Sequence, residues 1–417
     1  MPDEVVARRG FAVRDALAAI DHVKPYESTR GPIEHVPDSP HCGCASARRT
    51  LTPRGSMNTH GTTGRTASAI PGPLHTAADM PSRWDDVELS FDEATDRIIQ
   101  AHAKDGAARD LPIGDLKTWA IAPNDGTFAL VPIARHHAPK PLRSTAFSNL
   151  MARVGAPVEF IRKLPAPLQL ATTNYLLGAH DDTSSATLRL RGDEVAAVVS
   201  GRYAPMDPEE LLSCVRSSLV RFGLLDDVRV RGVASGLVDN LRLILPGEET
   251  VLKPGDVSNV GIDISTSSFG RSAIHLSPMI WRLVCTNGLR SPERRGELSF
   301  RHVGDTDRLR AAIAEAIPSA LAHARGLMTQ WQRAVSFMIE DVQQLVDSMR
   351  ELSVGEKKSF EEAIKVGAEV KELPEHLPVY DLVNALTSTA RSAVPARRLE
   401  LEALAGEVLS RHVGRAS

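Results

Sequence analysis

The sequence has little of what marks several specialised protein classes. Its 417 residues include only 4 cysteines, which excludes a fold held together by disulfides. No run of about 18 apolar residues occurs, so a transmembrane helix is excluded as well. Aromatic residues make up 4%, yet 42% of the residues are hydrophobic and 24% are charged. This composition predicts a globular chain with roughly two to three domains, or one large core with appendages.

Common catalytic motifs are absent too. The chain has no P-loop sequence, no G-x-G-x-x-G after a predicted strand, no H-E-x-x-H and no G-x-S-x-G. The C-x-C pair Cys42–Cys44 has histidines nearby but too few ligands at standard spacing for a structural zinc site. We therefore predict no catalytic residue, no cofactor and no metal, and favour a protein that is not an enzyme. The cysteine usage and the lack of a secretory signal predict a reduced, cytoplasmic chain that contacts no membrane.

Positive and negative residues are nearly equal in number, but the positive residues are mostly of one type. A formal net charge of -3 excludes a basic footprint for nucleic acid over the whole chain. Of 49 basic residues, however, 39 are arginine and only 10 are lysine. A GC-rich genome would produce this bias, and so would a need for bidentate contacts to phosphate or carboxylate groups. Composition leaves both interpretations open.

Changes in composition along the chain predict three parts. Residues 1–83 are rich in Pro, Gly, Ser, Thr and His, and we expect a flexible arm there, with a short amphipathic helix from Val5 to Val23. Residues 84–304 predict an α+β core domain, mainly antiparallel strands with flanking helices. Residues 305–417 predict a C-terminal helical region that contains a long heptad-patterned helix.

Local patterns place the elements of the core. Asp207 followed by Pro208 predicts the start of a helix that runs to Phe222. In the β-rich middle of this core, alternating or short apolar runs predict six strands, at Ala186–Arg191, Glu194–Ser200, Val228–Ala234, Leu237–Leu245, Val260–Thr266 and Ala273–Leu276.

The C-terminal helix carries an apolar seam whose spacing alternates between three and four residues. A seam this narrow packs against a partner helix, either within the chain or in a second copy, and the second alternative predicts a homo-oligomer. The seam consists of Met328, Trp331, Val335, Met338, Val342, Leu345, Met349 and Leu352.

Three segments are unusual for a plain core. Ser200–Asp207 displays Arg and Tyr at a strand-to-helix turn, although a simple turn would also explain it. Gly255–Arg271 ends in a Ser/Thr/Gly run that offers many donors to phosphate oxygens, unless it is only a solvent loop. Arg282–Gly288 places an Arg within an apolar run, where it needs a carboxylate, a carbonyl or a ligand phosphate as partner.

In this order, the three segments resemble the family called domain of unknown function 932, which is associated with phages and plasmids. The resemblance covers about residues 84–412 and includes the helix Thr145–Val154, the stretch Asn174–Leu177 and the C-terminal Leu382–Thr387. The family often has Asn-Ser-Glu where this chain has Ser265–Ser267, so an acidic contact is lost here. The resemblance implies a setting in mobile elements and, by analogy, a similarity to phage single-strand annealing proteins.

From these observations we expect a nucleic-acid-binding protein that acts on single-stranded DNA in recombination or replication. An electropositive track with a base-stacking tyrosine would bind the strand, and internal carboxylates on its arginines would weaken this hypothesis. The candidate residues are Arg189, Arg191, Arg202, Tyr203, Arg271, Arg282, Asn287 and Arg290.

Two alternatives stay open. One is a protein-interaction module, such as a host-defence antagonist or an assembly accessory, whose partner surface is the long helix. The other is a hydrolase or nuclease, for which Asp256 and Asp263 would have to converge on a metal. Its site would draw on Arg202, Tyr203, Asp207, His275, Cys285 and Asn287.

Overall fold

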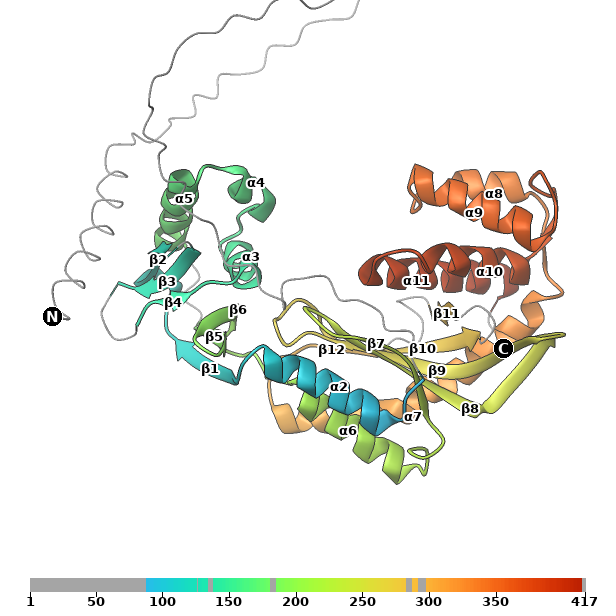
Figure 1. Cartoon of the computed structure of the whole chain (residues 1–417), viewed down its shortest axis with the longest axis horizontal. Coiled ribbons are helices and arrows are strands. Elements are labelled where there is room, and N and C mark those ends of the chain that lie inside the picture. The colour runs from blue at the N-terminus through green and yellow to red at the C-terminus, as the bar shows by residue number, and fades with distance from the viewer. Residues whose placement is uncertain are drawn as a thin grey trace, which may run out of the picture.

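The computed structural model describes residues 88–125, 127–133, 138–180, 185–282, 287–291 and 298–414, and only the backbone of Asn287. The predicted arm at 1–83, the Cys42–Cys44 pair and Cys285 lie outside these residues. Figure 1 shows the described residues arranged as two lobes. We call residues 108–200 the first lobe, and residues 88–104 together with 204–414 the second lobe.

The first lobe has two small antiparallel sheets and three helices around one apolar core. One sheet has the order β1-β5-β6 and the other β2-β3-β4. The strands are β1 (Ala108–Ile113), β2 (Trp119–Asn124), β3 (Thr127–Pro132), β4 (Lys140–Pro141), β5 (Ala186–Arg191) and β6 (Glu194–Ser200). The three helices are α3 (Ser144–Arg153), α4 (Val158–Lys163) and α5 (Ala166–Ala179), and a 3-10 turn, η2 (Leu116–Thr118), precedes β2.

The second lobe is built on a larger antiparallel sheet in the order β11-β10-β9-β8-β7, with β12 also paired to β10. Its strands are β7 (Arg229–Ala234), β8 (Asp239–Lys253), β9 (Asp256–Thr266), β10 (Ile274–Arg282), β11 (Asn287–Arg290) and β12 (Leu298–Phe300). In Figure 1, one face of this sheet is covered by α2 (Phe91–Lys104), α6 (Pro208–Arg221) and α7 (Thr306–Ala334). Alternate strand residues such as Leu243, Ile262 and Ile280 are buried in the same apolar core as these helices.

The C-terminal helices complete that core. They are α8 (Val342–Ser348), α9 (Val354–Gly367), α10 (Val379–Ala390) and α11 (Pro395–Val413), with the short pair β13 (Met338–Ile339) and β14 (Leu377–Pro378). Their apolar residues belong to the same cluster as those of the sheet. The hydrophobic cores therefore divide the chain near residue 200, and not near 305 as composition predicts. No helix in the described part of the chain is long and apolar enough to cross a bilayer.

The predicted fold class is confirmed, since antiparallel sheets and helices make up the described residues. Strands β5 and β6 have the predicted bounds, and α6 begins at Pro208 as predicted. Strands β8 and β10 are longer than predicted, because each continues past the end of its apolar run.

The prediction of one helix carrying the whole apolar seam is wrong. Helix α7 ends at Ala334, Met338 lies in β13, and Val342 begins α8. Most of the seam is buried within the chain, and only Met338 is exposed, because the residues pack against the sheet and the later helices. The intramolecular alternative therefore applies to the buried residues of the seam.

A buried ionic network joins the sheet to the last helix. Arg242 of β8 donates from Nε to Asp263 Oδ2 of β9 at 3.0 Å and from Nη2 to Glu402 of α11. Arg398, one turn earlier on α11, donates from Nε to the other oxygen of Glu402 at 3.1 Å. All four side chains are buried, so each charge depends on its partners for compensation.

Replacing Glu402 by Gln should lower the free energy of unfolding by about 3 kcal/mol, because two buried guanidinium groups lose a shared anion. Urea unfolding of the full chain measures this. Glu407→Gln is the matched control, since Glu407 forms the same i,i+4 pair with Arg411 on α11 but with exposures of 53% and 58%. That variant should change stability by less than about 0.5 kcal/mol. Equal effects in the two variants would contradict a buried network that depends on its charges.

Candidate functional site

Arg189 of β5 is the centre of an ionic cluster where the two lobes meet. Its Nε donates to Asp110 Oδ1 of β1 at 3.0 Å, and its Nη2 donates to both carboxylate oxygens of Asp207 at 3.0 Å. Its Nη1 donates to the carbonyl oxygen of Ser268 at 3.0 Å. Because Arg189 is buried and bound to two carboxylates, it is not available to a phosphate.

Asp207 has a role that the sequence does not indicate. It occupies the N-cap position of α6 as predicted, but its side chain caps no backbone N–H. It accepts from Arg189 and also from Arg191 Nη2 at 3.2 Å, and the Arg191 guanidinium lies 5.7 Å from the centre of the Phe269 ring. The carboxylate therefore ties β5 of the first lobe to α6 of the second.

Tyr203 is not free to stack on a base. Its ring stacks on His302 at a centroid distance of 5.1 Å and an interplanar angle of 15°. Its hydroxyl accepts from Arg189 Nη1 at 3.3 Å. Burial raises the pKa of Tyr203 and lowers the pKa of His302 to about 4. Both rings therefore stay neutral at pH 7 and belong to the packing of the junction.

Three other arginines lie on the surface of this junction, and we call Arg202, Arg271 and Arg301 the junction patch. All three are exposed, and none forms an ion pair within the described residues. Their backbone segments meet at the junction. The carbonyl of Arg202 accepts from Gly304 N at 3.2 Å, and Tyr203 forms a β-bridge with Val303. Gly270, which precedes Arg271, packs so closely on β6 that an added Cβ would lie 3.0 Å from Val199 Cγ1.

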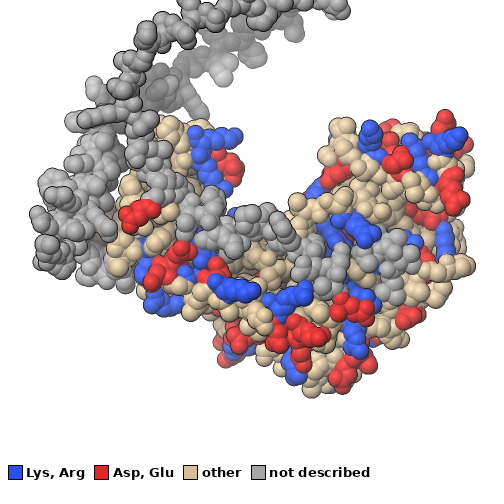
Figure 2. All heavy atoms as spheres, in the orientation of Figure 1, with Lys and Arg blue, Asp and Glu red and all other residues tan. Residues whose placement is uncertain are grey.

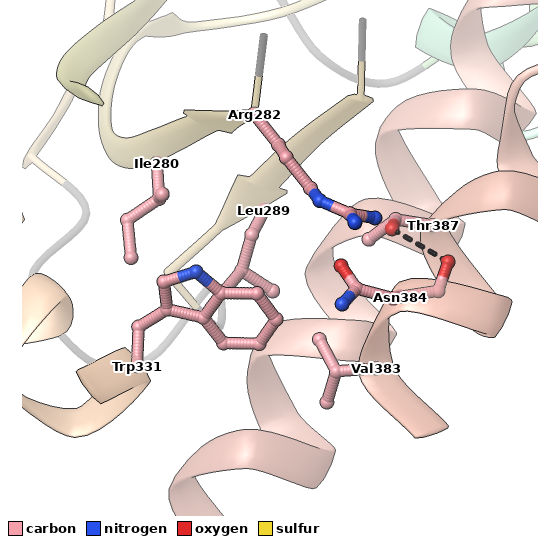
Figure 3. Close-up of a pocket in the computed structure, with 7 residues that line it drawn as sticks. All are labelled: Ile280, Arg282, Leu289, Trp331, Val383, Asn384 and Thr387. Atoms are coloured by element: carbon pink, nitrogen blue, oxygen red, sulfur yellow. Dashed lines mark hydrogen bonds between the residues drawn. The ribbon is translucent and has the colours of Figure 1, made fainter. Parts of the chain in front are cut away.

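Arg282 lies elsewhere, at the far end of β10. Its Nε donates to Asp256 Oδ1 at 2.6 Å, and its guanidinium lies 5.9 Å from the centre of the Tyr380 ring. Figure 3 shows Arg282 beside Asn384 and Thr387 of α10, above the apolar side chains that line the rest of a small pocket. The structure therefore brings Arg282 together with Asn384 and Thr387, which belong to two family-like segments that lie far apart in the sequence.

This pocket is too small for a nucleotide. Its volume is about 10 Å³, which corresponds to one water molecule. The Thr387 hydroxyl donates to the Asn384 carbonyl at 3.1 Å, as the dashed line in Figure 3 shows. We therefore assign Arg282 to the packing of α10 on the sheet.

The remaining predicted residues, Arg290 and Asn287, lie on β11, at the same edge of the sheet as Arg282. Arg290 of β11 is buried, and its Nη2 donates to Ser277 Oγ at 2.6 Å. The Asn287 backbone pairs with Arg282 across β10 and β11. The predicted single track is thus split into a junction group (Arg189, Arg191, Arg202, Tyr203, Arg271) and a group at the β10–β11 edge (Arg282, Asn287, Arg290).

The carboxylates of the enzyme hypothesis do not converge. Asp256 pairs with Arg282, whereas Asp263 pairs with Arg242. His275 lies on β10 opposite Ser265, and Cys285 falls outside the described residues. In the ranges that the structure describes, no three His, Cys, Asp or Glu side chains are placed to hold a metal ion.

Sequence reasoning missed Asp110, His302 and Arg301. Asp110 and His302 join the cluster only because β1 and the segment after β12 fold back on β5 and on the turn at Tyr203. Arg301 stands directly after a short strand, and its chain position alone does not distinguish it from the many other arginines.

These observations define a two-lobed mixed α/β protein whose lobes are joined by an arginine–carboxylate cluster. Residues 195–373 match the family model described as Domain of unknown function (DUF932), and this confirms the resemblance. The match runs from β6 to just beyond α9, so it includes Tyr203, Arg271 and Arg282 but not Leu382–Thr387. No curated protein and no solved structure matches the chain.

The buried His302 should make stability depend on pH. Its pKa is 6.5 in an ordinary setting and about 4 when folded, because burial disfavours the charged ring. The unfolded chain therefore binds the extra proton first, and stability should be lost as pH falls from about 6.5 to about 4. The loss should reach about 3 kcal/mol at the low end.

Unfolding by urea at several pH values, for the parent chain and His302→Phe, isolates this contribution. The variant keeps an aromatic ring against Tyr203 but cannot titrate. The difference in stability between the two proteins should change across this pH window and stay constant above it. A difference that is flat from pH 7 to pH 4 would show that His302 does not carry the effect.

Proposed function

We propose that this protein binds single-stranded nucleic acid and that the junction patch holds its phosphates. The observation that carries the proposal is that the backbone segments of Arg202, Arg271 and Arg301 meet at the junction, and that these exposed arginines have no carboxylate partner in the described part of the chain. Guanidinium groups bind phosphate oxygens with bidentate geometry, and several of them on one surface suit a polyanion.

The buried cluster beneath the patch supports the proposal by fixing the segments that carry it. Asp207 and Asp110 hold Arg189, and Arg189 holds the loop at Ser268, three residues before Arg271. The stack of Tyr203 on His302 keeps Arg202 next to the segment of Arg301. In this proposal Arg189, Arg191 and Tyr203 position the contact residues and do not touch the strand themselves.

The alternative of a protein-interaction module loses the surface first assigned to it. The long helix α7 packs its apolar stripe into the core of the second lobe, including Ile313, Ile317 and Ala324. A homo-oligomer stays a prediction without an assigned surface. The family resemblance adds the proposed setting, which is recombination or replication of mobile elements such as phages and plasmids, in the cytoplasm.

The test is binding of the purified full chain to a fluorescent single strand of about 40 bases, followed by anisotropy at several salt concentrations. We expect binding that weakens steeply with salt. The triple variant Arg202→Ala, Arg271→Ala, Arg301→Ala should reduce the slope of log affinity against log salt by about 2, since each lost phosphate contact removes about 0.7.

Arg350→Ala is the matched control, because Arg350 is an exposed arginine on the C-terminal side of α8, away from the junction. It should leave both affinity and slope unchanged. Thermal unfolding should be the same for all variants, since each removed side chain is exposed. Absence of binding by the parent chain at low salt would falsify the proposed function.

A further inference from the structure

The structure exposes few aromatic rings, and two of them stand apart from the rest. In the described residues the exposed aromatic side chains are Phe160 and Tyr175, each 60% exposed, Phe222 at 41% and Phe337 at 37%. An arginine covers the ring of Phe222 and another covers that of Phe337, each at 5.4 Å from the ring centre. Phe160 and Tyr175 have no aromatic or cationic group against their rings within the described chain.

Tyr175 is held rigidly although it is exposed. Its neighbour Asn174 pairs with the backbone of Ile121 on strand β2, accepting from the N–H at 2.7 Å and donating to the carbonyl at 3.0 Å. This pairing imitates a strand and fixes the rotation of α5 about its axis. Leu170, Thr173 and Leu177 are buried on the inner side of α5, so Tyr175 must point outward.

Phe160 lies on α4, directly before α5, on a helix that also carries Glu159, Arg162 and Lys163. Lys163 on the same helix is exposed and forms no ion pair in the described residues. The backbone carbonyls of Arg162 and Leu164 accept from Gln169 Nε2 of α5 at 3.1 and 2.9 Å, which locks the two helices together. An exposed ring, a free ammonium group and a second exposed ring therefore stand on one rigid pair of helices.

This pair of helices borders the space between the lobes. Figure 1 places α3 between α4 and the junction along the side of the first lobe that faces the C-terminal helices. Figure 2 shows an open hollow on that side, with Lys or Arg atoms next to Asp or Glu atoms on the part of the first lobe that corresponds to α4. A strand that leaves the junction along this side of the first lobe reaches α4 by way of α3.

We infer that Phe160 and Tyr175 form a base-stacking platform for the strand whose phosphates contact the junction patch. This inference rests on the proposed function and adds the residues that bind the bases. Bases stack on aromatic rings whatever their sequence, so the platform would bind single strands without strong sequence preference. A duplex would bind poorly, because its bases are stacked on one another and not available.

Single-stranded nucleic acid suits this surface better than a second copy of the chain does. Helix α5 carries no charged residue, so it supplies neither ion pairs nor repulsion to orient a protein partner. On α4 the exposed Glu159 forms an ion pair with Arg162 at 3.4 Å, which leaves Lys163 as the unpaired charge of this helix in the described residues, and a cation suits a phosphate. The two bare rings are of the residue type that stacks bases, and a positive charge beside such rings is typical of single-strand grooves.

The experiment compares Phe160→Ala and Tyr175→Ala with the parent chain in the single-strand binding assay. Each variant should weaken affinity about tenfold with an unchanged salt slope, because a stacking contact and no phosphate contact is lost. Tyr175→Phe should restore parent affinity, since it keeps the ring and removes only the hydroxyl. Phe222→Ala is the matched control, an exposed aromatic on the second lobe, and should bind like the parent.

The outcomes separate the inference from the proposed function. Parent-like binding by both alanine variants overturns the platform while single-strand binding itself stands. No binding by the parent removes the proposed function and the platform with it. A dimer of the parent chain in sedimentation that Tyr175→Ala converts to a monomer would also overturn the platform, because the face would then cover a second copy. A duplex that binds as tightly as the single strand would contradict base stacking.

Discussion

The pairing of Arg189 with Asp207 and Asp110 is the interaction on which the arrangement of the two lobes depends. Arg189 lies on the first lobe, Asp207 starts a helix of the second, and the carbonyl of Ser268 belongs to a loop of the large sheet. A buried guanidinium stays charged because it cannot lose its proton. Its positive charge therefore requires partners such as these for compensation. Arg143 adds a second tie across the junction, donating to Asp105 at 2.8 Å.

This constraint divides the arginines of the chain into two groups with different roles. The first group forms ion pairs with carboxylates of the same chain, and it consists of Arg189, Arg191, Arg242 and Arg282. Arg202, Arg271 and Arg301 remain exposed without such partners among the described residues. Part of the arginine content therefore serves ion pairs within the fold. The proposed contact surface is small, but the rigid cluster beneath it keeps it organised.

Local patterns in the sequence were reliable where one element decides its own conformation. Strands β5 and β6 and the start of α6 follow from alternation and from the Asp207–Pro208 pair. The apolar seam from Met328 to Leu352 does not form one helix. The same spacing is also compatible with two helices that are joined by a turn and pack on the same core. The length of β8 was underestimated, because the C-terminal half of this strand is polar on one side and pairs only with β9.

The sequence by itself indicated the resemblance to this family, which residues 195–373 match, the class of fold and the segments that carry unusual residues. Only the tertiary structure decided which of those residues are available. The sequence predicts that Asp207 caps a helix, yet its carboxylate binds two arginines of β5. The sequence predicts that the Tyr203 ring is exposed, yet His302 covers it. Tyr175, in contrast, stays exposed, because the pairing of Asn174 with β2 turns it outward. The physical reason is that burial and charge neutralisation depend on partners from distant parts of the chain, which no local pattern encodes.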